Sequence, residues 1–196
     1  MNVSNNISME YEARVMVDEN QYLKIRDFYL SRHPNYHQLV NKNIYLDTDD
    51  LYIVHHEMVL RIRVIDEKEK ELTLKIKGEK GDKEVTTSLD DKQYQSLLKG
   101  EVSFPCNVAD ELINKGLDLS KIKVITTLIT ERIEFIYDEY LLVIDKNYYN
   151  DIIDFDIEVE SSSREKALDY LKKAVEPFGV KYKEGYKSKS RRAMIK

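Results

Sequence analysis

The feature that most constrains the fold is a strict alternation of charged and apolar residues in several short stretches. The first is residues 9–15, Met-Glu-Tyr-Glu-Ala-Arg-Val, where Glu10, Glu12 and Arg14 occupy every second position. Successive side chains of a β-strand point to opposite faces of a sheet, so these three charges share one face. The stretch therefore predicts a strand with one charged face and one apolar face.

The alternation returns in three later stretches, and the sign of the charge differs between them. One of them puts Asp156, Glu158 and Glu160 on one face, which is wholly acidic. The other two carry basic pairs, Arg61 with Arg63 and Lys75 with Lys77. A face that only keeps a protein soluble tends to mix the two signs, whereas here the signs are separated by strand.

Strands are expected to account for most of the regular structure. Their expected ranges are 9–17, 43–46, 59–65, 71–78, 83–89, 123–137, 140–146 and 153–161. Helices are expected at 19–31, 90–100, 108–114 and 164–177. The short piece 51–55 is ambiguous. Most links between strands are short, which favours antiparallel pairing.

We predict an α+β fold that is mainly β, an eight-stranded antiparallel closed tunnel. Eight antiparallel strands with few helices can close into a barrel. The apolar faces would then lie outside, covered by the helices, and the charged faces would line the lumen. The alternative is an ordinary half-buried sheet whose charged face is solvated. The separation of charge by strand favours the tunnel with a charged lumen.

Length and composition narrow the class of protein. The 196 residues fit one domain, 8–196, after a loose N-terminus, 1–7. The net charge of −5 argues against a nucleic-acid binder but allows a concentrated basic site for a small anion. The only cysteine, Cys106, excludes an intramolecular disulfide and fits a reducing compartment. With no signal peptide and no long apolar run, we expect a cytoplasmic protein that does not enter a membrane.

Walls of opposite charge in one lumen predict a particular chemistry. Basic side chains hold a polyanion, and arginine can do so through two parallel hydrogen bonds. Carboxylates spaced along a strand hold a hard divalent cation such as Mg²⁺. Such a cation neutralises the charge that develops on a phosphoryl group. The residues therefore point to a metal-dependent site for a polyphosphate.

The motifs resemble those of the CYTH superfamily, the triphosphate tunnel metalloenzymes, which include class IV adenylate cyclases and thiamine and inorganic triphosphatases. The family's opening Glu-x-Glu-x-Lys is similar to Glu10, Glu12 and Arg14, and its Arg-x-Arg is similar to Arg61 and Arg63. The match spans residues 10–192 in the right order and is most like an uncharacterised branch found in Firmicutes. Further matching positions are Tyr45, Asp47, Thr48, Lys75, Glu84, Arg132, Asp145, Glu158, Glu160, Lys189 and Arg192.

The resemblance implies a role for each charged position. Mg²⁺ or Mn²⁺ would be held by carboxylates, namely Glu10, Glu12, Glu84, Asp145, Asp156, Glu158 and Glu160. Phosphate oxygens would be held by basic residues, namely Arg14, Arg61, Arg63, Lys75, Lys77, Arg132, Lys189 and Arg192. Lys75 and Tyr45 are the catalytic candidates, which would orient the attacking water. The alternatives are surface ion pairs for the charged residues and a core position for Tyr45.

Two residues depart from the family's pattern. Arg14 stands where the family has lysine, and its fork and reach differ from those of an ammonium group. Thr130 stands where many members carry a second basic residue on the long hairpin. Fewer cations there would weaken the hold on a long or nucleoside-linked polyphosphate.

The expected function is hydrolysis of an inorganic or organic triphosphate by a metal-dependent triphosphatase. The first alternative is a class IV-type adenylate cyclase, which makes cyclic AMP and pyrophosphate from ATP. The second is a polyphosphate- or nucleotide-binding module without catalysis. The expected partner is a small molecule that contains a triphosphate, with no nucleic acid and no membrane. Barrels of this family can pair, so the resemblance also allows a homodimer.

Overall fold

The computed structural model describes residues 5–79, 81–101 and 106–195. In this part of the chain there are two compact units, each with its own apolar core. Unit 1 takes in the described residues of 1–9, 42–128 and 189–196, and unit 2 takes in 10–41 and 129–188. None of the described helices combines the length and the apolar character that crossing a lipid bilayer demands.

Nine strands are assigned in the described residues, and they are hydrogen-bonded in the order β1-β6-β5-β4-β3-β7-β8-β9-β2. Their bounds are β1 Asn5–Glu10, β2 Glu12–Val17, β3 His37–Asp47, β4 Met58–Ile65, β5 Glu69–Ile76, β6 Asp82–Ser88, β7 Lys123–Ile136, β8 Tyr140–Tyr149 and β9 Ile152–Ser161. The helices are α1 Glu19–Arg32, α2 Tyr52–His55, α3 Asp91–Leu98, α4 Asn107–Asn114, α5 Arg164–Val175 and α6 Lys189–Met194, with 3₁₀ turns η1 Leu119–Lys121 and η2 Glu176–Phe178. The α+β, mainly antiparallel class is therefore confirmed.

The prediction of a closed ring of eight strands is wrong in the number of strands and in the closure of the sheet. The stretch expected as one strand over 9–17 is two strands, β1 and β2, with Tyr11 between them. β1 neighbours β6 and β2 neighbours β9, so the two strands are the two ends of an open, nine-stranded order. The alternation of residue types gave no sign of this break. It reports which face a side chain takes and not which neighbour the strand pairs with.

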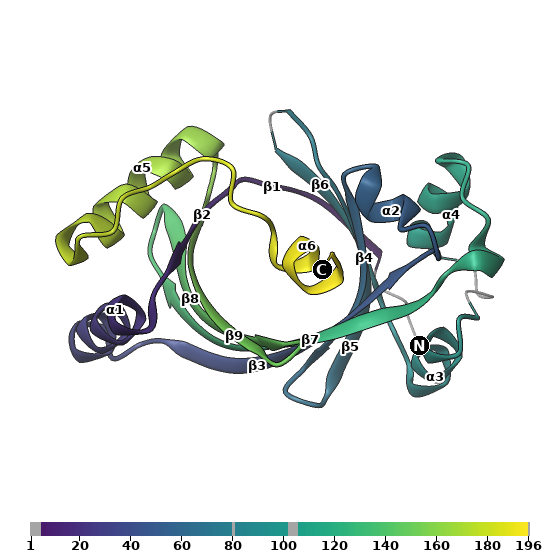
Figure 1. Cartoon of the computed structure of the whole chain (residues 1–196), viewed down its shortest axis with the longest axis horizontal. Coiled ribbons are helices and arrows are strands. Elements are labelled where there is room, and N and C mark those ends of the chain that lie inside the picture. The colour runs from purple at the N-terminus through teal and green to yellow at the C-terminus, as the bar shows by residue number, and fades with distance from the viewer. Residues whose placement is uncertain (1–4, 80, 102–105, 196) are drawn as a thin grey trace. The chain divides into compact units, whose positions relative to one another are not determined.

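Unit 2 is a sheet with helices on one face. α1 and α5 both pack on the apolar face of β8, β9 and β2 (Figure 1). The buried residues of this core include Val15, Phe135, Leu142, Ile157 and Leu171. The strand residues among them alternate with the charged residues of the same strands, so one sheet face is apolar and the other is charged.

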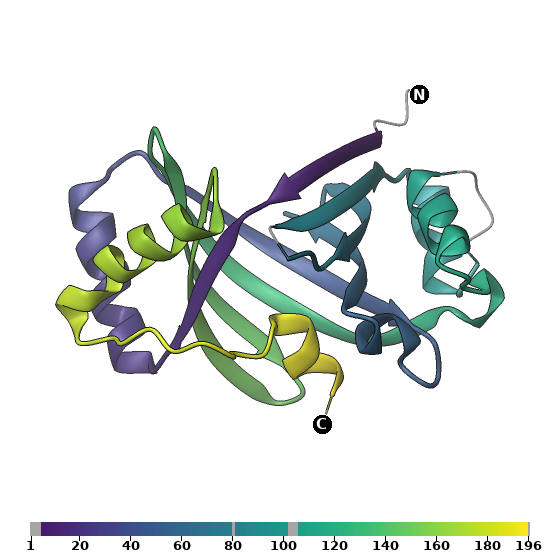
Figure 2. The same cartoon turned by 90° about the horizontal axis from the view of Figure 1, so that it is seen from above.

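Unit 1 is built in the same way from β3, β4, β5 and β6. α3 and α4 lie on one side of these strands (Figure 2), and they contribute the fully buried side chains of Leu97, Val108 and Leu112. The strands contribute residues such as Leu60, Ile62 and Leu74 to the same core. The expectation that helices cover the apolar faces is therefore confirmed within each unit.

The Asp-Thr pair at the end of β3 organises the next turn of chain. Asp47 is fully buried and accepts hydrogen bonds from the backbone N–H groups of Thr48, Ile53 and Val54 at 2.8, 2.8 and 2.9 Å. These bonds satisfy N–H groups at the start of α2, as an N-terminal cap does. The ambiguous stretch 51–55 is therefore a helix that a buried carboxylate holds in place.

Two further elements differ from expectation. β3 begins at His37 rather than Asn43, and most residues of its first part are exposed, so no alternation announces it. The basic C-terminal stretch contains α6, of which Ser190, Ala193 and Met194 are buried. A helix is predicted from apolar residues that recur with a period of 3.6 residues, and this period cannot be recognised reliably in so short a stretch.

Candidate functional site

The charged face of unit 2 gathers most of the acidic residues singled out from the sequence. Strand register places Arg14 opposite Glu158, and Asp145 opposite both Arg132 and Asp156. Partners that lie opposite each other in a ladder share a face. This face also carries Glu12, Glu134, Asp154 and Glu160.

Arg132 is the most firmly held cation of this face. Its Nε and Nη2 donate to the two oxygens of Asp145 at 3.0 and 2.8 Å, and its Nη2 also donates to Glu158 Oε2 at 3.2 Å. Asp145 is fully buried. A two-pronged guanidinium–carboxylate pair of this kind is geometrically specific. Asp145 therefore has Arg132 as its partner in this structure, and its geometry suits a residue that positions Arg132.

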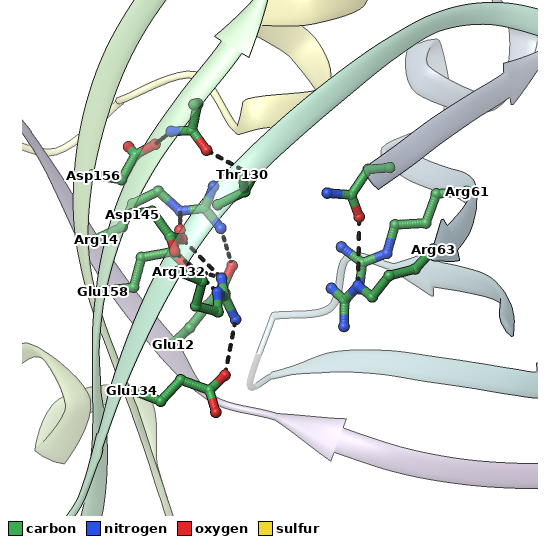
Figure 3. Close-up of polar contacts among 12 residues, drawn as sticks. Glu12, Arg14, Arg61, Arg63, Thr130, Arg132, Glu134, Asp145, Asp156 and Glu158 are labelled. Carbon is green, nitrogen blue, oxygen red and sulfur yellow. Dashed lines mark hydrogen bonds and ion pairs between the residues drawn. The ribbon is translucent and has the colours of Figure 1, made fainter. Parts of the chain in front are cut away.

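Glu158 lies between two arginines. Its Oε1 is 3.3 Å from Arg14 Nε, and its Oε2 accepts the bond from Arg132. Arg14 also donates from Nη2 to Glu12 Oε1 at 2.5 Å. Figure 3 shows these side chains converging on one another. Burial opposes the charge of each arginine, but the surrounding carboxylates prevail and raise the pKa of Arg14 and of Arg132.

Negative charge still exceeds positive charge at one end of this face. Glu12 and Glu160 lie directly opposite each other on β2 and β9, an arrangement of like charges that is unfavourable without a cation. The pKa of Glu160 is raised to about 7, first by burial and then by the carboxylates of Glu10, Glu158 and Glu12, against the opposing effect of Arg132. The two arginines therefore do not compensate all of these carboxylates.

The donor chemistry of this group fits a hard divalent cation. Glu10, Glu12, Glu158 and Glu160 offer carboxylate oxygens, which Mg²⁺ and Mn²⁺ prefer, and the first three of these carboxylates add to the effect of burial on the pKa of Glu160. In the described residues no three acidic, histidine or cysteine side chains converge as a ready metal cage. The guanidinium of Arg14 lies between the carboxylates of Glu12 and Glu158 and contacts both.

The shifted pKa of Glu160 predicts a dependence of stability on pH. The folded protein holds this proton more tightly than the unfolded chain, whose glutamate titrates near pH 4.5. The stability that Glu160 contributes is therefore fully present below about pH 4.5 and is lost as the pH rises through about 7. With EDTA present, the free energy of unfolding of the wild type should fall between pH 5.5 and pH 8. We expect this fall to be smaller in Glu160→Gln by on the order of 1–2 kcal/mol.

Urea denaturation at the two pH values measures this effect. Glu131→Gln is the matched control, because Glu131 lies exposed on the same unit and accepts a hydrogen bond from the Tyr148 hydroxyl. Equal pH dependence in wild type and Glu160→Gln would show that Glu160 titrates normally.

A buried polar network next to these residues was missed by sequence reasoning. The side-chain amide of Asn147 donates to Asp154 at 3.0 Å and to Asp156 at 2.8 Å, and its oxygen accepts a bond from Thr130 at 2.9 Å. Tyr149 also donates to Asp154, at 2.5 Å. Thr130 therefore supports a neutral amide that holds two carboxylates. The signal was present, since Asn147 and Asp154 extend the alternation of Asp145 and Asp156 by one step each.

The charged face of unit 1 carries the basic residues of β4 and β5. Arg61 and Arg63 lie along β4 (Figure 3), opposite Thr73 and Glu71 of β5. Arg61 Nη2 makes a long contact of 3.5 Å with Glu84, while its Nε is buried and has no hydrogen-bond partner in the described structure. A buried donor without an acceptor is costly, so this atom suits an anion. Glu84 is thus placed beside Arg61.

The lysines and Tyr45 differ in their surroundings. Lys75 lies opposite Glu84 and 3.5 Å from Asp82, on the same face as Arg61. Lys77 follows the end of β5, is 57% exposed and pairs with Glu57 at 2.7 Å. Tyr45 is buried but is not part of the apolar cluster of unit 1. It alternates with the core residues of β3, which places it on the charged face.

The two basic residues of the C-terminal stretch, Lys189 and Arg192, both lie in α6 of unit 1. Arg191, between them, donates to the backbone oxygen of Val54 at 3.3 Å. This contact links α6 to α2 within unit 1. The phosphate-binding roles of Lys189 and Arg192 stay predictions.

The fold is that of an α+β protein built on antiparallel strands whose charged faces carry carboxylates, arginines and lysines. A family model for the CYTH domain matches residues 8–193, and the chain belongs to this family. The resemblance inferred from the motifs is therefore confirmed. No curated protein matches the sequence closely enough to count as a relative.

Solved structures agree with this assignment. A candidate adenylate cyclase from Bacillus halodurans is 25% identical, with 95% of this chain and 97% of that chain covered and a TM-score of 0.85. A candidate adenylyl cyclase from Hippeastrum, described as having a dominant triphosphatase activity, is 18% identical, with 93% of each chain covered and a TM-score of 0.76. The PH1819 protein of Pyrococcus horikoshii is 19% identical, with 88% and 91% covered and a TM-score of 0.60. Together with the family, these neighbours support an enzyme that acts on phosphoanhydrides.

Proposed function

We propose that this protein is a metal-dependent triphosphatase that hydrolyses an inorganic or organic triphosphate. The observation that carries the proposal is the excess of carboxylates over arginines on the charged face of unit 2, where Glu12 and Glu160 lie directly opposite each other. A cluster of this kind favours a divalent cation. The basic face of unit 1 supplies the complementary chemistry, because its arginines and Lys75 suit phosphate oxygens.

In this proposal Mg²⁺ or Mn²⁺ is held by Glu10, Glu12, Glu158 and Glu160. The bound cation would neutralise charge on the phosphoryl group that is transferred. The other carboxylates considered as ligands have positioning roles suggested by their contacts. Asp145 holds Arg132, Asp156 is oriented by Asn147, and Glu84 lies against Arg61.

The basic residues bind the substrate. Arg61 and Arg63 hold phosphate oxygens, and the buried Nε of Arg61 gains the acceptor that it lacks in the described structure. Arg132, fixed by Asp145, contributes a second guanidinium. Lys75 and Tyr45 orient the water that attacks the terminal phosphorus, and the bond from that phosphorus to the bridging oxygen breaks. The remaining basic residues, Arg14, Lys77, Lys189 and Arg192, contribute positive charge to the same substrate.

A class IV-type adenylate cyclase is the second candidate, and the Bacillus halodurans structure favours it. In that reaction the ribose 3′-hydroxyl of ATP attacks the α-phosphorus and pyrophosphate leaves. The same metal and phosphate ligands would serve both reactions, because both reactions require the charge of a triphosphate to be neutralised. The two functions therefore differ in the nucleophile and in the need to recognise adenine.

A product assay distinguishes these functions. The purified protein is given inorganic triphosphate, thiamine triphosphate or ATP, with Mg²⁺ or with Mn²⁺, and free phosphate and cyclic AMP are both measured. We expect phosphate release that depends on the cation and is fastest with one triphosphate. Cyclic AMP with pyrophosphate would establish the cyclase instead. Tight triphosphate binding without any product would indicate a binding module.

A further inference from the structure

Arg14 spans two of the carboxylates that the proposed function assigns to the metal. Its Nη2 lies 2.5 Å from Glu12 Oε1 and its Nε lies 3.3 Å from Glu158 Oε1. The three residues come from adjacent strands, and Arg14 lies directly opposite Glu158 in the β2–β9 ladder. A guanidinium in this place offsets part of the negative charge of Glu12 and Glu158, as a bound metal cation would.

The two arginines that contact Glu158 are not equally fixed. Arg132 makes a two-pronged pair with the fully buried Asp145, at 3.0 and 2.8 Å. The Arg14 contact with Glu158 is longer, and its partner Glu12 has a side chain that is 19% exposed. Withdrawing Arg14 therefore breaks its contacts with the partly exposed Glu12 and with Glu158, which keeps its contact with Arg132, whereas withdrawing Arg132 would remove the guanidinium that bonds both oxygens of the fully buried Asp145.

We infer that Arg14 is an internal counter-cation that a divalent metal must displace from Glu12 and Glu158. This inference rests on the proposed metal-dependent function. A carboxylate oxygen cannot bind the guanidinium and the metal in the same place. The guanidinium and the metal therefore compete for Glu12 and Glu158, and each weakens the binding of the other by the same factor. Arg14 thus lowers the affinity of the free protein for metal. Once displaced, its fork is available to the phosphate oxygens of the substrate.

The inference predicts that removing the Arg14 charge strengthens metal binding. We expect Arg14→Gln to bind Mn²⁺ at least about 10-fold more tightly than wild type, because the carboxylates lose their competing cation. Arg14→Lys should lie between them, because an ammonium group is a single point charge and cannot form the fork that reaches both carboxylates. Calorimetric titration of the protein with Mn²⁺ alone, without substrate, measures these affinities.

Arg26→Gln is the matched control. Arg26 lies on α1 of the same unit and pairs with the adjacent Asp27 at 2.7 Å, so this variant makes the same change in net charge away from the charged face. We expect its Mn²⁺ affinity to equal that of wild type. Equal tightening in Arg26→Gln and Arg14→Gln would overturn the inference, since net charge alone would then explain the effect.

Thermal unfolding supplies a second readout. Without metal, Arg14→Gln should melt at a lower temperature than wild type, because Glu12 and Glu158 both lose their contact with the Arg14 guanidinium. Mn²⁺ should raise its melting temperature by more than it raises that of wild type. If Arg14→Gln does not fold, Arg14→Lys gives the same comparison with the charge kept.

The possible failures are distinct. Unchanged or weaker Mn²⁺ binding in Arg14→Gln and Arg14→Lys, with wild type still binding, would overturn the role of Arg14 and leave the metal-dependent function intact. A complete lack of Mn²⁺ binding in wild type and variants, with all of them folded, would overturn the proposed metal site and the role of Arg14 together.

Discussion

Replacing Arg132 by alanine should lower the free energy of unfolding by about 3–5 kcal/mol, the cost of breaking a buried ion pair by removing one partner. Both oxygens of Asp145 accept hydrogen bonds from Arg132, and Asp145 is fully buried. Glu158, 2% exposed, would lose a partner as well. Urea denaturation in EDTA at pH 7.5 measures the loss.

Two further variants show whether the buried carboxylate is the cause. Arg26→Ala removes an arginine of the same unit that pairs with Asp27, which is 63% exposed, so its cost should stay within about 1 kcal/mol. Arg132→Ala combined with Asp145→Asn should recover part of the stability, because the buried charge is gone. A loss in Arg132→Ala no larger than in Arg26→Ala would contradict a buried ion pair.

Replacing Glu158 by glutamine should lower metal-dependent triphosphate hydrolysis by at least about 100-fold, the size of effect expected when a group that stabilises the transition state is lost. Glutamine keeps the shape of the side chain but offers a neutral oxygen in place of a carboxylate. Glu158 is nearly fully buried between Arg14 and Arg132, so an anion from solvent does not replace the negative charge that the variant loses. Turnover with Mg²⁺ and with Mn²⁺, measured with calorimetric Mn²⁺ binding, tests the expectation.

The control for this variant is Glu134→Gln. Glu134 lies on β7 of the same unit, and its contact with Arg132 is longer, at 3.7 Å. It is not one of the proposed metal ligands, so its turnover should stay within a few-fold of wild type. Full activity in Glu158→Gln would remove Glu158 from the metal site. A similar loss in both variants would point to a general electrostatic effect of the face.

Local patterning was enough to predict the position of most strands and the side of the sheet that their charges take. Alternation depends only on the geometry of an extended chain, so Glu12, Arg14, Glu158 and Arg61 could be assigned to charged faces before their neighbours were known. The same reasoning predicted that helices cover the apolar faces, because an apolar sheet face must be buried. The family resemblance added Arg132, Asp145 and other positions that no single strand pattern reveals.

Partners across strands could not be read from the chain. The break at Tyr11, which separates β1 from β2, depends on the hydrogen bonding of each to a distant strand. The pairing of Arg14 with Glu158 and of Arg132 with Asp145 joins residues more than ten positions apart, and it changes their expected roles. The raised pKa of Glu160 has the same origin. Burial and opposing carboxylates exist only once the strands are in register, because charge interactions depend on distance in space and not on separation along the chain.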